Sequence, residues 1–180
     1  MNGGRLAWAG VTSPPTADVP STDLADLIAT DHRVIDKLFT DLASEREDRF
    51  LLAHRLLDEV ATHTAAEQQI LYPALRDIVP GGVELANRGQ AEHQSMRRAL
   101  ETIERTHPGD AEFEEAVTTL AAEMRAHAPA EEAELLPALR DAVGSAPLLE
   151  LGAIYAQMKE SYPSGLQALP ADIPEPKLLS

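Results

Sequence analysis

Residues 63–79 read HTAAEQQILYPALRDIV and residues 127–143 read HAPAEEAELLPALRDAV, so one segment recurs 64 positions later with ten of seventeen residues identical. The chain therefore contains an internal duplication. Each copy begins with a histidine that is followed four residues later by a glutamate, and the pairs are His63 with Glu67 and His127 with Glu131. Four residues along an α-helix turn the side chain through about 400°, so both members of a pair lie on one face, one turn apart. Two such faces turned inward could hold a metal pair between them.

The composition around the repeat is typical of helices. Ala, Leu, Glu and Arg dominate residues 22–142, and aromatic residues make up only 4% of the chain. Apolar residues at a helical period, interrupted by Pro and Gly, predict four long helices near residues 22–44, 46–72, 83–106 and 110–143. Pro73 is expected to kink or end the second helix, with a short turn after it. Short connections favour antiparallel neighbours, so the predicted fold class is all-α, an antiparallel up-down-up-down four-helix bundle.

The two ends of the chain differ from this helical region. Residues 1–21 hold three prolines and several small polar residues, and predict a flexible leader. Residues 144–180 predict a short fifth helix, from Leu148 to Lys159, followed by a proline-rich tail. A chain of 180 residues, 44% hydrophobic, is long enough for one packed core and too short for two full domains. The expected organisation is therefore one domain over residues 22–143.

Charge and cysteine content exclude several classes of partner and site. The formal net charge of −15 repels phosphate, so neither nucleic acid nor an anionic membrane is expected as a partner. The chain has no cysteine, which excludes disulfides, thiolate zinc sites, iron-sulfur clusters and cysteine nucleophiles. No apolar run is long enough for a membrane span and no signal peptide is evident, so the expected location is cytoplasmic.

Two further histidines extend the duplicated pattern. His32 precedes His63 by 31 residues, and His93 precedes His127 by 34. Each pair of helices then supplies two histidines and one glutamate. The six candidate metal ligands, three for each of two metals, are His32, His63, Glu67, His93, His127 and Glu131. A lone histidine on an apolar stripe is more often hydrogen-bonded than a ligand. Burying four imidazoles and two carboxylates without a cation is far more costly, and imidazole with carboxylate favours Fe or Mn, with Zn also possible.

Glu132 competes with Glu131 for the last position. It lies five residues after His127, and Pro129 stands between them, so a local distortion of the helix could present Glu132 instead. The residue that matches Glu132 in the first copy is Gln68, whereas Glu131 matches a glutamate, so the duplication favours Glu131.

Other candidates are weighed by their angle around the helix. His54 lies about 180° from His63 and is expected to face solvent, as is His107, which sits in a turn beside a proline. Tyr155 or Tyr162 could reach a metal from above. Tyr72 lies about 180° from His63 on an undistorted helix and is the tyrosine least expected to reach the site.

The order His, HxxxE, His, HxxxE on successive helices resembles the hemerythrin-like family, also described as HHE cation-binding domains. The motifs are DHRVIDKLF around His32, HTAAEQQILYP, AEHQSM around His93, and HAPAEEAELLP, and they span roughly residues 22–143. The resemblance implies a bundle that holds a non-haem diiron centre, with the six candidates as ligands to two iron ions bridged by both carboxylates and an oxo or hydroxo group. Arg97 stands where oxygen-carrying hemerythrins have a further histidine, and those proteins place their last carboxylate at the Glu132 position.

The resemblance also implies a range of functions. One imidazole fewer favours redox chemistry over reversible oxygen carriage, and relatives of this ligand type are associated with peroxide breakdown, with responses to oxygen, nitric oxide or iron, and with iron handling. The expected function is a reaction with small oxidants, chiefly hydrogen peroxide in a catalase-like dismutation, without catalytic residues separate from the metal ligands. The alternative is a module that senses or binds O2, NO or iron without turnover. The expected partner is a small molecule (peroxide, O2 or NO), and the sequence identifies no protein partner.

Overall fold

The structure, a computed structural model, describes residues 22–44 and 48–162, and all regular structure in these ranges is helical. The expected all-α class is therefore confirmed. The elements in chain order are α1 Leu24–Ala43, α2 Arg49–Ala66, the π-helical η1 Glu67–Leu71, α3 Tyr72–Ile78, α4 Gly82–Arg105, α5 Ala111–Ala130, the π-helical η2 Glu131–Leu135, α6 Leu136–Val143 and α7 Ser145–Ser161. The expected leader, the start of the second helix at residue 46 and the proline-rich tail from residue 163 lie outside the described residues.

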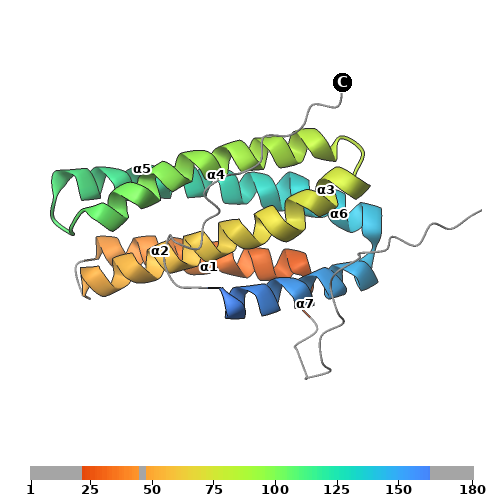
Figure 1. Ribbon diagram of the computed structural model, residues 1–180, viewed down its shortest axis with the longest axis horizontal. Helices are drawn as coiled ribbons and strands as arrows, with labels where there is room; N and C mark the ends of the chain where they lie inside the picture. The colour runs from red at the N-terminus through yellow and green to blue at the C-terminus, as the bar shows by residue number, and fades with distance from the viewer. Residues whose placement is uncertain (1–21, 45–47, 163–180) are drawn as a thin grey trace, which may run out of the picture.

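These elements join into five continuous rods, because η1 links α2 to α3 and η2 links α5 to α6 (Figure 1). Among the long rods, α1 contacts α2 and α5, and α4 contacts α5 and α2. The expected fifth helix is α7, which is longer than predicted at both ends, lies along α1 and also contacts α2 and α6. Within the described part of the chain, no helix is long and apolar enough to cross a membrane.

The second long helix does not end at Pro73, and the short turn expected after that proline is replaced by α3, which continues to Ile78. A π turn precedes the proline, in which the Tyr72 N–H bonds to the Glu67 carbonyl five residues back. The second copy repeats this arrangement, with the Leu136 N–H bonded to the Glu131 carbonyl. The wider turn changes the hydrogen-bond partners where proline offers no N–H, so the rod stays continuous.

The core is divided into two apolar clusters. One is formed by the second half of α1, most of α2, α5 and the second half of α4, and includes Phe39, Leu56 and Phe113. The other is formed by the start of α1 with η1, α3, α6 and α7, and includes Leu75 and Leu139. On the α1, α4 and α5–η2 rods the buried His and Glu side chains fall between the residues of the two clusters, and on the α2–η1 rod His63 and Glu67 lie on either side of the boundary between them. The fold thus holds a polar layer between two apolar ones.

Candidate metal centre

The structure brings all six candidate ligands together in the polar layer. Their exposed fractions range from 0% to 6%. His32 comes from α1, His63 from α2, His93 from α4 and His127 from α5. The two glutamates are the first residues of the π segments η1 and η2. Each glutamate is therefore positioned four residues after its histidine by regular α-helix, and the helix widens only beyond it.

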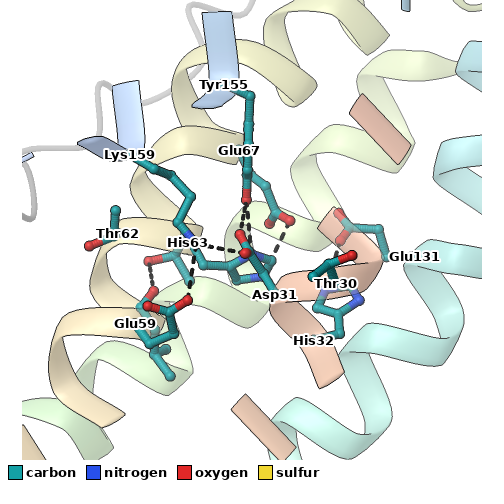
Figure 2. Close-up of polar contacts among 12 residues, drawn as sticks. Thr30, Asp31, His32, Glu59, Thr62, His63, Glu67, Glu131, Tyr155 and Lys159 are labelled. Carbon is teal, nitrogen blue, oxygen red and sulfur yellow. Dashed lines mark hydrogen bonds and ion pairs between the residues drawn. The ribbon is translucent and has the colours of Figure 1, made fainter. Parts of the chain in front are cut away.

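Each carboxylate faces imidazoles from both halves of the duplication. The Oε1 atom of Glu67 lies 3.3 Å from His63 Nε2, and its Oε2 atom lies 3.2 Å from His93 Nε2. The Oε2 atom of Glu131 lies 3.7 Å from His127 Nε2 and 3.4 Å from His32 Nε2. Figure 2 shows His32, His63 and the two carboxylates turned toward one interior space. The two halves are thus interlocked through their glutamates.

The ligand atoms form two groups that share His127. One group consists of His32, His63, His127 and Glu131, the other of Glu67, His93 and His127, and within each the donor atoms lie within 4.8 Å of one another. In the described part of the chain, seven buried atoms of these residues have no hydrogen-bond partner: His32 Nε2, His63 Nε2, His93 Nδ1 and both oxygens of Glu67 and Glu131. Buried polar atoms are normally satisfied, and a cation would supply the missing partner of the four carboxylate oxygens and of the Nε2 atoms of His32 and His63. The donor set suits iron, manganese or zinc.

The pKa values of the buried histidines and glutamates in the absence of a cation also favour a metal site. Burial lowers the pKa of His63 to about 4, although Asp31 opposes the shift. Burial and the neighbouring His127 lower the pKa of His93 well below its usual value. Both imidazoles are then neutral at pH 7, which is the form that binds a metal. Burial and Glu131 raise the pKa of Glu67 well above its usual value.

The two carboxylates differ in their electrostatic surroundings. Burial would raise the pKa of Glu131 as well, but His32 and His127 outweigh burial and lower that pKa. Two carboxylates in one dry layer do not both remain charged unless positive charge compensates them. The layer is therefore built for a cation.

The outer nitrogens of two imidazoles, His32 and His127, are held by further side chains. His32 Nδ1 lies 2.8 Å from Glu132 Oε1, and His127 Nδ1 lies 2.7 Å from Glu92 Oε2. The Glu132 side chain is 41% exposed and that of Glu131 is 1% exposed, so Glu131 faces the interior and Glu132 lies at the rim. Such outer hydrogen bonds fix the orientation of an imidazole ring.

Tyr72 reaches the site, contrary to the expectation from sequence. Its hydroxyl lies 3.0 Å from His93 Nε2, and the two ring centroids are 5.3 Å apart. The π turn η1 accommodates an additional residue and rotates the side chains after it by roughly 100°, so the angular separation from His63 assumed for a regular helix does not apply. Gly89 makes room for the ring, because a Cβ at that position would lie 2.6 Å from the Tyr72 hydroxyl.

His54 and His107 are exposed, as predicted.

Two other residues around the site, Asp31 and Glu92, were not predicted from the sequence. Asp31, however, is 9% exposed and accepts a hydrogen bond from Tyr155 at 2.6 Å. A signal for it existed, since Asp31 stands three residues after Ile28 and is a charged residue on the apolar stripe of α1. Glu92 offered no comparable signal, because it precedes His93 on a polar helix surface.

Access to the cluster differs between its two sides. A hollow of about 480 Å³ opens between α1 and α5 and reaches His32; its lining includes Ile35, Phe39, Met124, Ala128 and Pro129. Beside His127, between α4 and α5, the space left among Gly89, Glu92 and Ala130 has no room for a water molecule. A small molecule would therefore approach from the His32 side.

Comparisons with known proteins agree with this geometry. The family described as the hemerythrin HHE cation binding domain matches residues 23–139. A protein from Nostoc sp. named DNA nickase is 29% identical over 133 residues, which cover 72% of this chain and 37% of the relative, so the chain spans little more than a third of that protein. A crystal structure of a hemerythrin HHE cation binding domain-containing protein from Mycobacterium kansasii aligns with a TM-score of 0.67 and 26% identity, over 77% of this chain and 86% of the other.

The family match covers well over half of the chain and contains all the candidate ligands. The same region carries the buried groups of imidazole and carboxylate that could hold a metal ion. The chain belongs to the hemerythrin HHE cation binding domain family.

Proposed function

We propose that the protein is a non-haem diiron protein that disproportionates hydrogen peroxide, and that its long rods form an antiparallel up-down-up-down four-helix bundle around the centre. The observation that carries the proposal is the pair of donor groups that share His127, in which Glu67 and Glu131 each face imidazoles of both halves. Two iron ions held by these groups would supply the electron exchange with peroxide. Disproportionation needs no external reductant, since one peroxide is oxidised to O2 while another is reduced to water.

The side chains around the centre provide a dry, ordered pocket. The neutral imidazoles of His63 and His93 offer lone pairs, and both glutamates offer two oxygens each. The Tyr72 hydroxyl stays protonated, because burial and Glu67 raise its pKa well above the usual value. It therefore places a hydrogen-bond donor beside His93, where it would orient a bound oxidant.

The surroundings of the site favour a neutral oxidant. The hollow at His32 is lined by an exposed ion pair, in which Arg125 Nε lies 3.0 Å from Asp36 Oδ1, and by Arg33, whose guanidinium adds one positive charge beside this pair. The net charge of −15 repels anions from the whole surface. Hydrogen peroxide, O2 and NO are neutral at pH 7 and approach without this repulsion. Superoxide is an anion and is repelled.

Oxygen evolution from peroxide tests the proposal. Iron-loaded protein should release O2, and His63→Ala should reduce the rate at least tenfold, since loss of even an outer partner of a metal ligand typically costs about 10–100-fold. His54→Ala, which changes an exposed histidine on the same helix, should leave the rate unchanged. Equal rates in wild type and His63→Ala, or no oxygen from either, would remove the proposal. A spectral shift with NO but without peroxide turnover would instead indicate the sensing alternative.

The same preparations should be tested on supercoiled plasmid, because one relative is named a DNA nickase. We expect no nicking in the absence of peroxide, since a chain of net charge −15 repels the phosphate backbone. Nicking that requires His63 would replace the peroxide proposal with hydrolysis of a phosphodiester.

A further inference from the structure

The outer nitrogen of His63 faces α7, a helix that lies beyond the residues matched by the family. The Tyr155 hydroxyl lies 3.2 Å from His63 Nδ1 and donates to Asp31 Oδ2 at 2.6 Å. A hydroxyl has a single hydrogen, and Asp31 receives it, so the Tyr155 oxygen accepts a hydrogen bond from His63 Nδ1–H. The neutral imidazole then carries its hydrogen on Nδ1 and turns the lone pair of Nε2 toward the interior of the centre.

Asp31 is held at both carboxylate oxygens. Its Oδ1 atom lies 2.7 Å from Lys159 Nζ, and the same ammonium group lies 3.1 Å from Glu59 Oε1. Figure 2 shows this chain of contacts from Glu59 on α2, through Lys159 on α7, to Asp31 on α1 and the Tyr155 hydroxyl above it. Hydrogen bonds between charged groups are short and directional. They fix the position of Asp31, and through Tyr155 that of the His63 ring.

The sequence of α7 places these side chains on one face. Leu148, Gly152, Tyr155 and Lys159 follow one another at intervals of three or four residues, and Leu148 and Tyr155 are each 1% exposed. Gly152 lets the helix approach the start of α1, because a Cβ there would lie 2.5 Å from the Thr22 carbonyl oxygen. The close approach brings Tyr155, one turn later, into reach of Asp31.

The second half of the centre is held differently. His127 is the residue that matches His63 in the other copy, and its outer nitrogen bonds to Glu92, whose side chain is 38% exposed. The outer nitrogen of His32 bonds to Glu132, which is 41% exposed. These carboxylates lie on helices of the matched region and are open to water. The buried network at His63 instead depends on α7.

We propose that α7 is a working part of the metal centre, and that Tyr155 and Lys159 are positioning residues that act through Asp31 and His63. They hold the His63 ring with its Nε2 lone pair directed at the position of the metal, and this slows release of the ion. The inference rests on the proposed metal binding but is independent of peroxide turnover.

The first experiment uses the metal-free, full-length chain. Nitrogen-15 NMR of histidine side chains should show His63 as the Nδ1–H tautomer in wild type. Tyr155→Phe removes only the hydroxyl and should change that tautomer or its population, whereas the matched control Tyr162→Phe, at the end of the same rod, should not. An Nε2–H tautomer of His63 in the wild-type protein would overturn the proposal.

The second experiment measures iron affinity by anaerobic competition between the protein and a coloured Fe²⁺ chelator. Tyr155→Phe should raise the Kd for Fe²⁺ by about 10–100-fold relative to Tyr162→Phe. Lys159→Met, compared with Lys37→Met on the exposed surface of α1, provides a second pair in case the tyrosine variant folds poorly. Equal affinities within each pair overturn the proposal. If Tyr155→Phe binds Fe²⁺ tenfold more weakly while the iron-loaded wild type evolves no oxygen, the result supports the role of α7 and excludes only the peroxide function.

Discussion

Glu131 and Glu132 are neighbours in the chain with opposite surroundings. Glu131 lies in the dry layer between His32 and His127, and Glu132 lies at the rim, where it bonds to the outer nitrogen of His32. The comparison of the two copies in the sequence favours Glu131, because the first copy has a glutamine at the position of Glu132. One residue along a helix changes the direction of a side chain by about 100°, which is the difference between the interior and the rim here.

Stability of the metal-free protein should depend on pH through His63. Its folded-state pKa of about 4 lies below the ordinary value of 6.5, so between these values the unfolded chain binds more protons. The stabilisation from His63 is fully present above pH 6.5 and is lost as the pH falls toward 4. A shift of about two and a half pH units corresponds to about 3 kcal/mol. His93 contributes in the same direction, whereas His32 and Glu67, whose pKa values are raised, contribute in the opposite one.

Urea unfolding at pH 7 and pH 5 measures this dependence. On going from pH 7 to pH 5, we expect the free energy of unfolding to change less favourably in the wild-type protein than in His63→Gln, because only the wild type carries the His63 contribution. His54→Gln serves as the control, since that residue is exposed. An unchanged pH dependence in His63→Gln would contradict the assignment of this titration to His63.

At the level of residues, spacing predicted the interior positions well and the partners around them poorly. A histidine and a glutamate four residues apart share a face in any α-helix, so the sequence alone could bring the six candidates to one layer. Tyr155 comes from a helix of weak pattern, and its contact with Asp31 depends on the close approach at Gly152. Contacts of this kind depend on the packing distance between helices, which helical periodicity does not encode.

At the level of elements, the two π turns are the largest departure from expectation. Proline predicts a break in a regular helix, and both copies of the repeat avoid it by widening the turn before Pro73 and Pro137. The π turn η1 also explains why the predicted direction of the Tyr72 side chain is wrong. The regular helical period places Tyr72 about 180° from His63, and the wider turn changes that angle. Apart from the end of the second helix, which continues to Ile78, and its start, which lies outside the described residues, the helix boundaries were predicted to within a few residues, since caps and turns are local in sequence.

The close approach of α3 and α4 can be tested at Gly89. A Cβ at this position would lie 2.6 Å from the Tyr72 hydroxyl and 2.8 Å from Cζ. We expect Gly89→Ala to destabilise the protein by about 1–3 kcal/mol, because overpacking outweighs the better helix propensity of alanine. The tyrosine should also be displaced from His93.

A double variant provides the control. Tyr72→Leu places at this position the residue that the second copy of the repeat has, Leu136. Gly89→Ala should cost little stability in that background, because the phenol that it meets is gone. If thermal or urea unfolding shows the same cost with and without Tyr72, the clash is not with this ring.

At the level of the whole molecule, the polar layer should make stability depend on the bound metal. The cluster keeps seven buried atoms without hydrogen-bond partners in the described part of the chain, and a cation would satisfy all of them except His93 Nδ1, whose ring turns Nε2 toward Glu67. A metal at 100 times its Kd stabilises the folded state by about 2.7 kcal/mol, which for a chain of this size raises Tm by roughly 5–11 °C. Thermal unfolding with Fe²⁺ and after chelation measures the difference. Ca²⁺, which prefers oxygen ligands, should have little effect, and equal shifts from both ions would contradict a site built on imidazole.

The two copies of the repeat can differ in the residues that follow their π turns. The wide turn separates the His–Glu ligand pair of each copy from these residues, so a substitution after the turn changes the surroundings of one pair and leaves the pair itself in place. The first copy has a phenol at Tyr72, beside His93, where the second has a hydrocarbon at Leu136. Two copies of one sequence unit can in this way give the buried cluster chemically unequal surroundings, with a hydroxyl on one side and a hydrocarbon on the other.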